Sequence, residues 1–249
     1  MAKATDLLKK FNNIKTLPHV AIRLSRLISD SNSAIKEFEE VISMDPALVV
    51  RLLKVVNSSY YGLQQKVALK DIFKEKSNNG PFSRNQLWLH CAASSILSRM
   101  ISERIFGQKG EDAFLCGLLH DIGMMVEDQV AQDLFLKACQ AFDESDSKAF
   151  INHEREILGT DHAVIGYMVA KDWNLPEGVQ SAIKLHHHVL DQVSPTTITG
   201  ILQISEFMLS KLKYSALPGM QSTISPSLAH YIRDNIEEFK LLIRDFPGE

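Results

Sequence analysis

The sequence has 249 residues, which is enough for one large domain or two small ones. Hydrophobic residues make up 45% and charged residues 23% of the chain, the balance of an ordinary water-soluble globular protein. A net charge of −3 gives no basic footprint for nucleic acid, and no apolar run approaches the length of a membrane span. We therefore expect neither nucleic acid nor a membrane among its partners.

The cysteines and the N-terminal stretch give an expectation for the cellular compartment of the protein. Cys91, Cys116 and Cys139 are scattered and lack the paired spacing of a zinc knuckle or a disulfide framework. They fit a reducing environment. The N-terminal stretch MAKATDLLKKFNN has no apolar core of a signal peptide. We expect a cytoplasmic protein.

Most of the chain has the period of amphipathic helices, and no alternating apolar run bounded by turns indicates a strand. Helices are expected over residues 18–27 and 33–42 and from Asp45, a capping carboxylate that precedes a proline at the first helical position. Polar loops are expected at 73–83 and 143–148. Further helices are expected at 86–105, 111–126, 151–158, 162–173, 177–188, 198–212 and 226–245. The predicted fold class is all-α.

Ionisable residues stand out within these apolar helical stretches. The sequence GLLHDIGMMVED, residues 117–128, places His120 and Asp121 side by side in the middle of an apolar run. Burying an unpaired imidazole or carboxylate costs free energy, so a hydrogen bond or a metal ion has to compensate. The same pattern recurs on three other predicted helices, at His90, at His162 and at His186, His187 and His188.

Each of these histidines has a structural explanation when it is taken alone, since a single buried histidine is usually a hydrogen-bonded core residue. Taken together, imidazoles and one carboxylate on four helices suit iron, manganese, nickel or zinc, and bundle cores are where facing helices build such sites. An adjacent His-Asp pair lets the aspartate span two ions, which would make the site dinuclear. The alternative is that the rings form hydrogen bonds with one another and that no ion is bound. His19, His153 and His230 are interpreted as surface or capping residues.

Several motifs in order resemble a known family. LPHVAIRL and DPALVVRLLKVVNSSYYG are followed by LWLHCAASS, AFLCGLLHDIG and GTDHAVIGYMVAKDWNLPEGVQSAIKLHH. This order resembles the HD superfamily of metal-dependent phosphohydrolases, and more closely the HDOD domain, a bacterial signalling relative of HD and HD-GYP domains, over roughly residues 17–212. The resemblance implies a helical N-terminal part (1–84) packed on an HD-like metal-site bundle (85–213). Residues 214–249 lie beyond the resemblance, and their apolar spacing predicts a helical extension.

The resemblance also implies a set of metal ligands. His90, His120 and Asp121 would hold a first ion, Asp121 would bridge, and His162, His186 and His187 would hold a second. The last ligand of the superfamily is an aspartate that follows a small residue on a late helix. Ser205 and Glu206 stand at that position here, so Glu206 is the candidate, with a side chain one methylene longer.

Three departures from catalytic relatives bear on function. Met124 stands where HD-GYP proteins carry a lysine that contacts substrate phosphate, and the GYP loop after the double histidine is absent. No arginine cluster is available to clamp a phosphate, and Arg155 and Lys184 are interpreted as solvated helix-face charges.

Three hypotheses follow from this pattern. The first is a bacterial signal-transduction domain that keeps the metal site, catalyses little or nothing, and binds a signalling protein or a small-molecule effector. The second is an active metal-dependent phosphohydrolase that acts on a nucleotide or cyclic dinucleotide. The third is a metal-free scaffold. The last helix packs on the bundle or mediates a homodimer.

Overall fold

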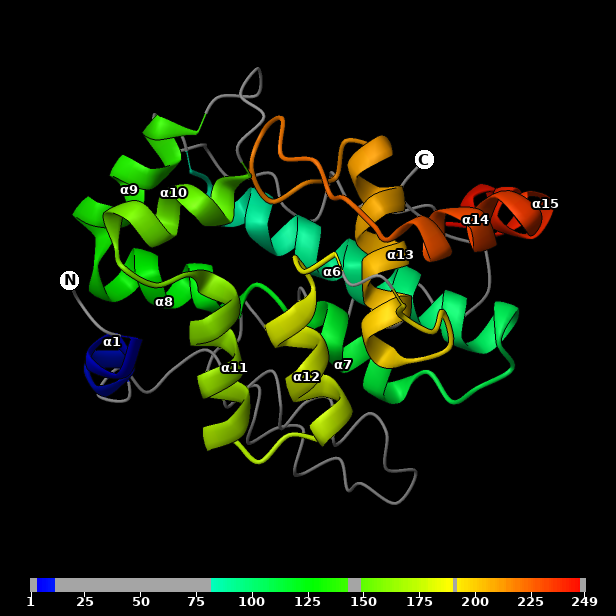
Figure 1. The fold of residues 1–249 in the computed structure, drawn as a ribbon, viewed down its shortest axis with the longest axis horizontal. Coiled ribbons are helices and arrows are strands. Elements are labelled where there is room, and N and C mark those ends of the chain that lie inside the picture. Colours follow the sequence, from blue (N-terminus) through cyan, green and yellow to red (C-terminus); the bar gives the residue numbers. More distant parts are fainter. Residues whose placement is uncertain (1–3, 12–81, 143–148, 190–191, 247–249) are drawn as a thin grey trace, which may run out of the picture.

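The computed structural model describes residues 4–11, 82–142, 149–189 and 192–246 (Figure 1). Every regular element within these ranges is helical and none is a strand, which confirms the all-α prediction. The helices are α1 (Ala4–Phe11), α6 (Arg84–Met100), η1 (Ile101–Ile105), α7 (Glu111–Leu119), α8 (Ile122–Val130), α9 (Gln132–Ala141), α10 (Phe150–Ile157), α11 (His162–Asp172), α12 (Glu177–Leu185), α13 (Ile198–Lys211), α14 (Pro226–Asp234) and α15 (Ile236–Arg244). The helices predicted between residues 18 and 56 and the loop at 143–148 lie outside the described residues, as does almost all of the loop at 73–83.

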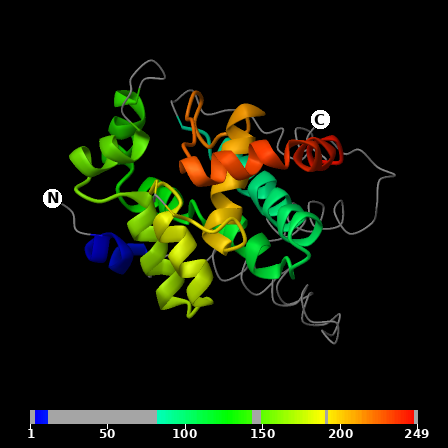
Figure 2. The same ribbon diagram turned by 45° about the vertical axis from the view of Figure 1, so that its right-hand side comes forward.

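Six helices form the bundle that surrounds the site. Helix α6 packs on α7 and α13, while α11 packs on α8 and α12, and α12 closes the ring by contacting α7 and α13. Helices α9 and α10 pair at one end of the molecule, and α14 and α15 lie at the other end (Figures 1 and 2). None of the helices in the described ranges has the length and apolar character that a bilayer crossing requires.

Two apolar clusters hold this bundle together. One joins α6, η1 and α13 to the C-terminal helices through residues such as Ile96, Ile204 and Phe239. The other joins α8, α9, α10 and α11 through residues such as Phe135 and Phe150. Because the C-terminal helices contribute to the first cluster, the described part of the 214–249 extension packs on the bundle. A homodimer stays a prediction.

Two predicted helices are interrupted, and the helix predicted at 177–188 ends at Leu185, so His186, His187 and His188 follow it instead of lying on it. The helix predicted at 111–126 is interrupted at His120 and Asp121, where the backbone of Asp121 turns to φ −98° and ψ 15°. The helix predicted at 226–245 is interrupted at Asn235, whose side-chain amide donates a hydrogen bond to the carbonyl oxygen of Tyr231 at 2.8 Å. Helix α9 was not predicted. At Asn235 the side chain thus bonds to a nearby backbone group in competition with a regular helix, whereas the side chain of Asp121 forms no such bond.

Close helix packing places two of the site's segments side by side. A Cβ atom on Gly123 would lie 2.0 Å from the carbonyl oxygen of His162, so only glycine allows the start of α8 to approach the start of α11 this closely. On the other side, a Cβ on Gly117 would lie 2.6 Å from the backbone of Ser94 on α6. The two glycines flank His120 and Asp121, so both contacts bring other helices to that dipeptide.

Candidate metal centre

The seven candidate ligands come from five separate segments. His90 lies on α6, His120 and Asp121 form the junction of α7 and α8, His162 opens α11, His186 and His187 follow the end of α12, and Glu206 lies on α13. Six of the seven are buried, and His187 is partly exposed. The structure brings all seven together in the middle of the bundle, although they span more than a hundred residues of sequence.

The carboxylate of Asp121 lies at the centre of this group and faces a different pair of imidazoles with each oxygen. Its Oδ2 lies 3.4 Å from Nε2 of His90 and 3.3 Å from Nε2 of His120. Its Oδ1 lies 3.5 Å from Nε2 of His162 and 3.4 Å from Nε2 of His186. One ligand atom from each of Asp121, His162, His186 and His187 lies within 4.8 Å of the others, and the same holds for His90, His120 and Asp121. The site therefore has two halves that share one carboxylate.

Glu206 belongs to the half that contains His90 and His120. Its Oε2 lies 3.2 Å from Nε2 of His90, and its Oε1 lies 3.5 Å from Nε2 of His120. The hydroxyl of Ser94 donates a 2.9 Å hydrogen bond to Oε1 and orients the carboxylate. The longer side chain of glutamate thus still reaches the centre.

Hydrogen bonds on the outer side of the rings determine which nitrogen faces the centre. The Nδ1 atoms of His90, His120 and His186 lie 2.6, 2.8 and 2.7 Å from backbone carbonyl oxygens of Tyr214, Gly117 and Ile183. A carbonyl oxygen only accepts hydrogen bonds, so each Nδ1 carries the hydrogen. In a neutral ring Nε2 then holds a lone pair, which is the form that binds a metal.

This arrangement leaves buried polar atoms without hydrogen-bond partners among the described residues. Both carboxylate oxygens of Asp121 and the Nε2 atom of His186 lack one. Buried polar groups are nearly always satisfied in native proteins, so unsatisfied atoms that converge on a common centre need an explanation. Imidazole nitrogens and carboxylate oxygens are suitable ligands for a divalent first-row transition metal ion. The residues present therefore fit one such ion in each half.

The electrostatics of the centre favour positive charge in one half. Burial by itself lowers the pKa of His90, but the carboxylates of Glu206 and Asp121 outweigh burial and raise this pKa well above its ordinary value. The pKa of His120 is raised in the same way. Burial would raise the pKa of Glu206, yet the charges of His90 and His120 lower it to about 2. Nε2 of His90 and Nε2 of His120 lie 3.0 Å apart, so in the absence of a metal a single proton between them would replace part of its charge.

The other half is electrostatically different. Burial and the neighbouring imidazoles lower the pKa of His187 well below its ordinary value, and burial also lowers that of His186. Both rings therefore stay neutral at physiological pH, in the form that offers a lone pair.

Sequence reasoning missed a pair of buried acids behind His162. Oε2 of Glu154, on α10, lies 2.6 Å from Nδ1 of His162, and neither side chain is exposed. Glu127, on α8, is equally buried and interacts with Glu154. Burial raises the pKa of both carboxyl groups, which favours their neutral forms. An acidic residue at the end of the apolar run GLLHDIGMMVED was the available signal for Glu127.

Other residues singled out from the sequence have clear positions. Arg155 is exposed and donates a 2.7 Å bond to Asp161, the N-cap residue of α11. The exposed Lys184 lies with Nζ 4.9 Å from the centre of the Tyr167 ring. The prediction that His153 is a surface or capping residue is wrong, because α10 turns it inward against Phe142 and only 7% of it is exposed.

Met124 is fully buried in the apolar cluster of α8 and α9. This is the position at which catalytic relatives were expected to carry a phosphate-contacting lysine. The methionine side chain is part of the core, so it offers no donor to a substrate.

The fold and site together define a helical bundle that surrounds a candidate two-ion centre of imidazole and carboxylate ligands. The chain belongs to the HDOD domain family, which matches it over residues 14–70 and 66–189.

Solved structures share the fold. An HDOD domain protein with unknown function from Geobacter sulfurreducens is 20% identical with a TM-score of 0.64, covering 98% of this chain and 88% of that one. A provisionally named signal transduction protein from Marinobacter aquaeolei is 18% identical with a TM-score of 0.59, covering 93% and 57%. A provisionally named phosphohydrolase from Shewanella amazonensis is 20% identical with a TM-score of 0.56, covering 98% of both chains.

A curated relative from Treponema pallidum, an uncharacterized protein, is 25% identical over 241 residues. The match covers 86% of this chain but only 46% of the relative, so the chain spans about half the length of that protein.

Proposed function

We propose that this chain is a signal-transduction HDOD domain that binds two divalent transition metal ions and acts by binding rather than by turnover. Its output is a contact with a signalling protein or with a small-molecule effector. The proposal places it in the cytoplasm, in agreement with three buried cysteines that form no disulfide.

The observation that carries the metal centre is the position of Asp121. Its two oxygens face two imidazole pairs at 3.3–3.5 Å, and neither oxygen forms a hydrogen bond among the described residues. Two half-sites that share a carboxylate are the arrangement in which a pair of ions is held by one bridging ligand. Iron, manganese, nickel and zinc all fit this ligand set.

The buried position of Met124 supports a role other than catalysis. A lysine at this position would add a cationic contact to the substrate phosphate, and the side chain present here is part of the apolar core. Arg155 is committed to the cap of α11, and Lys184 lies over an aromatic ring. Neither supports a phosphate clamp at the centre.

The alternative is an active metal-dependent phosphohydrolase on a nucleotide or cyclic dinucleotide. The paired half-sites favour it, because two ions held by a bridging carboxylate polarise a phosphate and lower the pKa of a bound water when they are present. His187, the partly exposed member of the set, is the candidate ligand nearest to solvent.

The experiment measures metal content and turnover on the same preparations. Elemental mass spectrometry of the full chain after reconstitution with iron or manganese should find about two ions, and the Asp121→Ala variant should lose both. Hydrolysis of bis(p-nitrophenyl) phosphate should equal that of His120→Ala. Wild-type protein without metal after reconstitution would refute the metal centre. Hydrolysis that His120→Ala abolishes would establish the alternative.

A further inference from the structure

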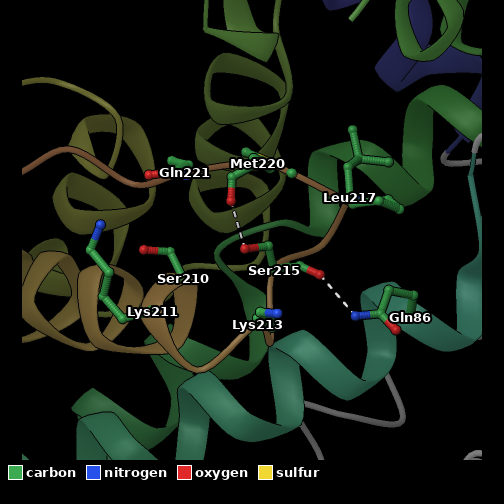
Figure 3. A pocket seen from close by; sticks show the side chains of 10 residues that line it. Gln86, Ser210, Lys211, Lys213, Ser215, Leu217, Met220 and Gln221 are labelled. Carbon is green, nitrogen blue, oxygen red and sulfur yellow. Dashed lines mark hydrogen bonds between the residues drawn. The ribbon is translucent and has the colours of Figure 1, made fainter. Parts of the chain in front are cut away.

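A cavity of about 590 Å³ lies where the chain leaves α13 and passes the start of α6 (Figure 3). Its lining includes Gln86, Lys211, Lys213, Ser215 and Gln221, and none of the seven candidate metal ligands. In Figure 3, Lys211 and Gln221 stand on one side of the hollow and Gln86 on the other. A cavity of this volume is within the usual range for a small-molecule site.

The charge of the lining indicates the class of ligand. Lys211 and Lys213 are its charged residues, and no carboxylate lines it. The hydroxyl of Ser215 donates to the carbonyl oxygen of Met220 at 2.6 Å, so its hydrogen is already used. The donors that remain are the ammonium of Lys213, the side-chain amide of Gln221, and the ammonium of Lys211, whose Nζ also lies 5.2 Å from the centre of the Phe207 ring. Such a lining complements the oxygens of a phosphate group.

The position of Lys213 is conformationally unusual. It follows the last turn of α13 with a φ of 62°, in the left-handed region where a helix normally ends on glycine. The next residue closes the turn by donating from its N–H to the carbonyl oxygen of Leu209 at 2.9 Å. A non-glycine residue held in such a conformation is a reason to look for a function of its side chain.

The wall of the cavity also supports the candidate metal centre. Nε2 of Gln86 donates to the carbonyl oxygen of Ser215 at 2.9 Å. The preceding carbonyl oxygen, that of Tyr214, lies 2.6 Å from Nδ1 of His90. Gln86 and His90 lie four residues apart on α6, so they share a face of that helix. The two-residue segment at 214–215 therefore contacts the cavity on one side and orients a candidate ligand on the other.

We propose that this cavity binds a small phosphate-bearing anion through Lys211 and Lys213, and that its occupancy changes the orientation of His90 through the carbonyl groups of Tyr214 and Ser215. Binding of the anion is independent of the function proposed above. The effect on a metal ligand rests on that function, and it would make the cavity an effector site for the centre.

The test uses inorganic pyrophosphate and the full chain after treatment with a chelator, so that no metal competes for the probe. Isothermal titration calorimetry should find saturable binding to the wild type. A Lys211→Ala/Lys213→Gly double variant should bind roughly tenfold or more weakly, because each lost ammonium removes a charge-assisted hydrogen bond. The control variant Lys137→Ala/Lys171→Ala removes the same charge from exposed positions on α9 and α11 and should bind like the wild type.

Nitrogen NMR spectra of the histidine rings test the connection to the centre. Pyrophosphate should shift the Nδ1–H signal of His90 in the wild type, leave the signal of His230 on α14 unchanged, and shift neither in the double lysine variant. Absent or unsaturable binding, or equal binding by both variants, would overturn the anion site. Saturable binding with no change at His90 would overturn the connection. Because all samples are metal-free, failure of the metal centre would not produce either result.

Discussion

The bond between Glu154 and His162 allows a sharp test of the candidate centre. With an ion on Nε2 of His162, Nδ1 carries the hydrogen and Glu154 accepts it across 2.6 Å in a fully buried position. Burial raises the pKa of Glu154, and the positive charge of an ion bound at the centre would oppose this and favour the carboxylate. Glu154→Gln keeps the size of the side chain and replaces that carboxylate by a neutral amide. A hydrogen bond to a charged group stabilises by about 1.5–3 kcal/mol and a neutral one by about 0.5–1.5 kcal/mol. The difference of about 1–2 kcal/mol predicts roughly 5- to 30-fold weaker metal binding.

Glu127→Gln is the matched control. The pKa of Glu127 is raised by burial and by the neighbouring Glu154, which favours the neutral form of its carboxyl group. A glutamine at position 127 keeps the size of that side chain and its lack of charge. We therefore expect the metal affinity of this variant to stay within about threefold of wild type. The assay is competition with a chromophoric chelator for manganese or zinc, resolved into a first and a second ion.

Comparison of the metal affinities of the two variants can refute the proposed role of Glu154. Equal affinity of Glu154→Gln and wild type would mean that the bond to His162 does not support a metal ligand. Equal losses in Glu154→Gln and Glu127→Gln would mean that the carboxyl pair acts through its packing. Urea denaturation of the metal-free proteins separates both results from a general loss of folding.

Three further perturbations test other parts of the structure. Gly123→Ala should lower the free energy of unfolding by about 3 kcal/mol or more, because its Cβ would meet the backbone of His162 at 2.0 Å; the control Gly178→Ala, whose Cβ would meet its nearest neighbour at 3.6 Å, should cost nothing in the same urea titration. Asp161→Ala should cost about 1 kcal/mol at pH 7 through loss of the α11 cap. Burial raises the pKa of Asp161, but the Val164 N–H and neighbouring positive charge outweigh it, so the folded pKa lies below the ordinary 3.8. The charged cap therefore stabilises the folded state fully at pH values above 3.8, and this stabilisation is lost as the pH falls through the pKa of the folded state. The loss of unfolding free energy in Asp161→Ala, measured by urea denaturation, should therefore be smaller in acid. Chelation should remove the stabilisation by the bound ion, about 2.7 kcal/mol when the ion is present at a hundred times its dissociation constant, and so lower the thermal midpoint of the wild-type protein. The midpoint of Asp121→Ala, measured in the same way by differential scanning calorimetry, should not change.

Hydrophobic periodicity was sufficient for the fold class and for most helices in the described ranges. It failed where a polar residue interrupts a helix without interrupting the apolar pattern. The run from Glu111 to Val126 has helical spacing throughout, yet the backbone turns at Asp121 because its carboxylate and the ring of His120 point to the same centre. Successive side chains of a continuous helix diverge by about 100°. The apolar periodicity therefore could not predict that two adjacent side chains point to the same centre.

The hydrogen-bond partners on the outer side of the ligand rings could not be predicted from the sequence for a different reason. The carbonyl group of Tyr214 is 124 residues away from His90 in sequence, and Glu154, although only eight residues before His162, lies on another helix. His153 was misassigned because a histidine on a short amphipathic helix is compatible with either face, and only the packing of α10 against Phe142 decides. The seven candidate ligands were found because their order resembles a family, and tertiary packing alone determines how their side chains meet.

The nature of the outer acceptors has an evolutionary consequence. His90, His120 and His186 are oriented by main-chain carbonyl groups, which every residue type possesses. Point mutations of Tyr214 or Ile183 therefore keep the acceptor group, whereas at Gly117 any side chain would meet the backbone of Ser94 at 2.6 Å. Glu154 is the exception, because the acceptor for His162 is a side chain. A single nucleotide change at Glu154 can therefore remove the hydrogen-bond acceptor behind His162. A change of residue type does not remove the main-chain acceptors of the other three rings.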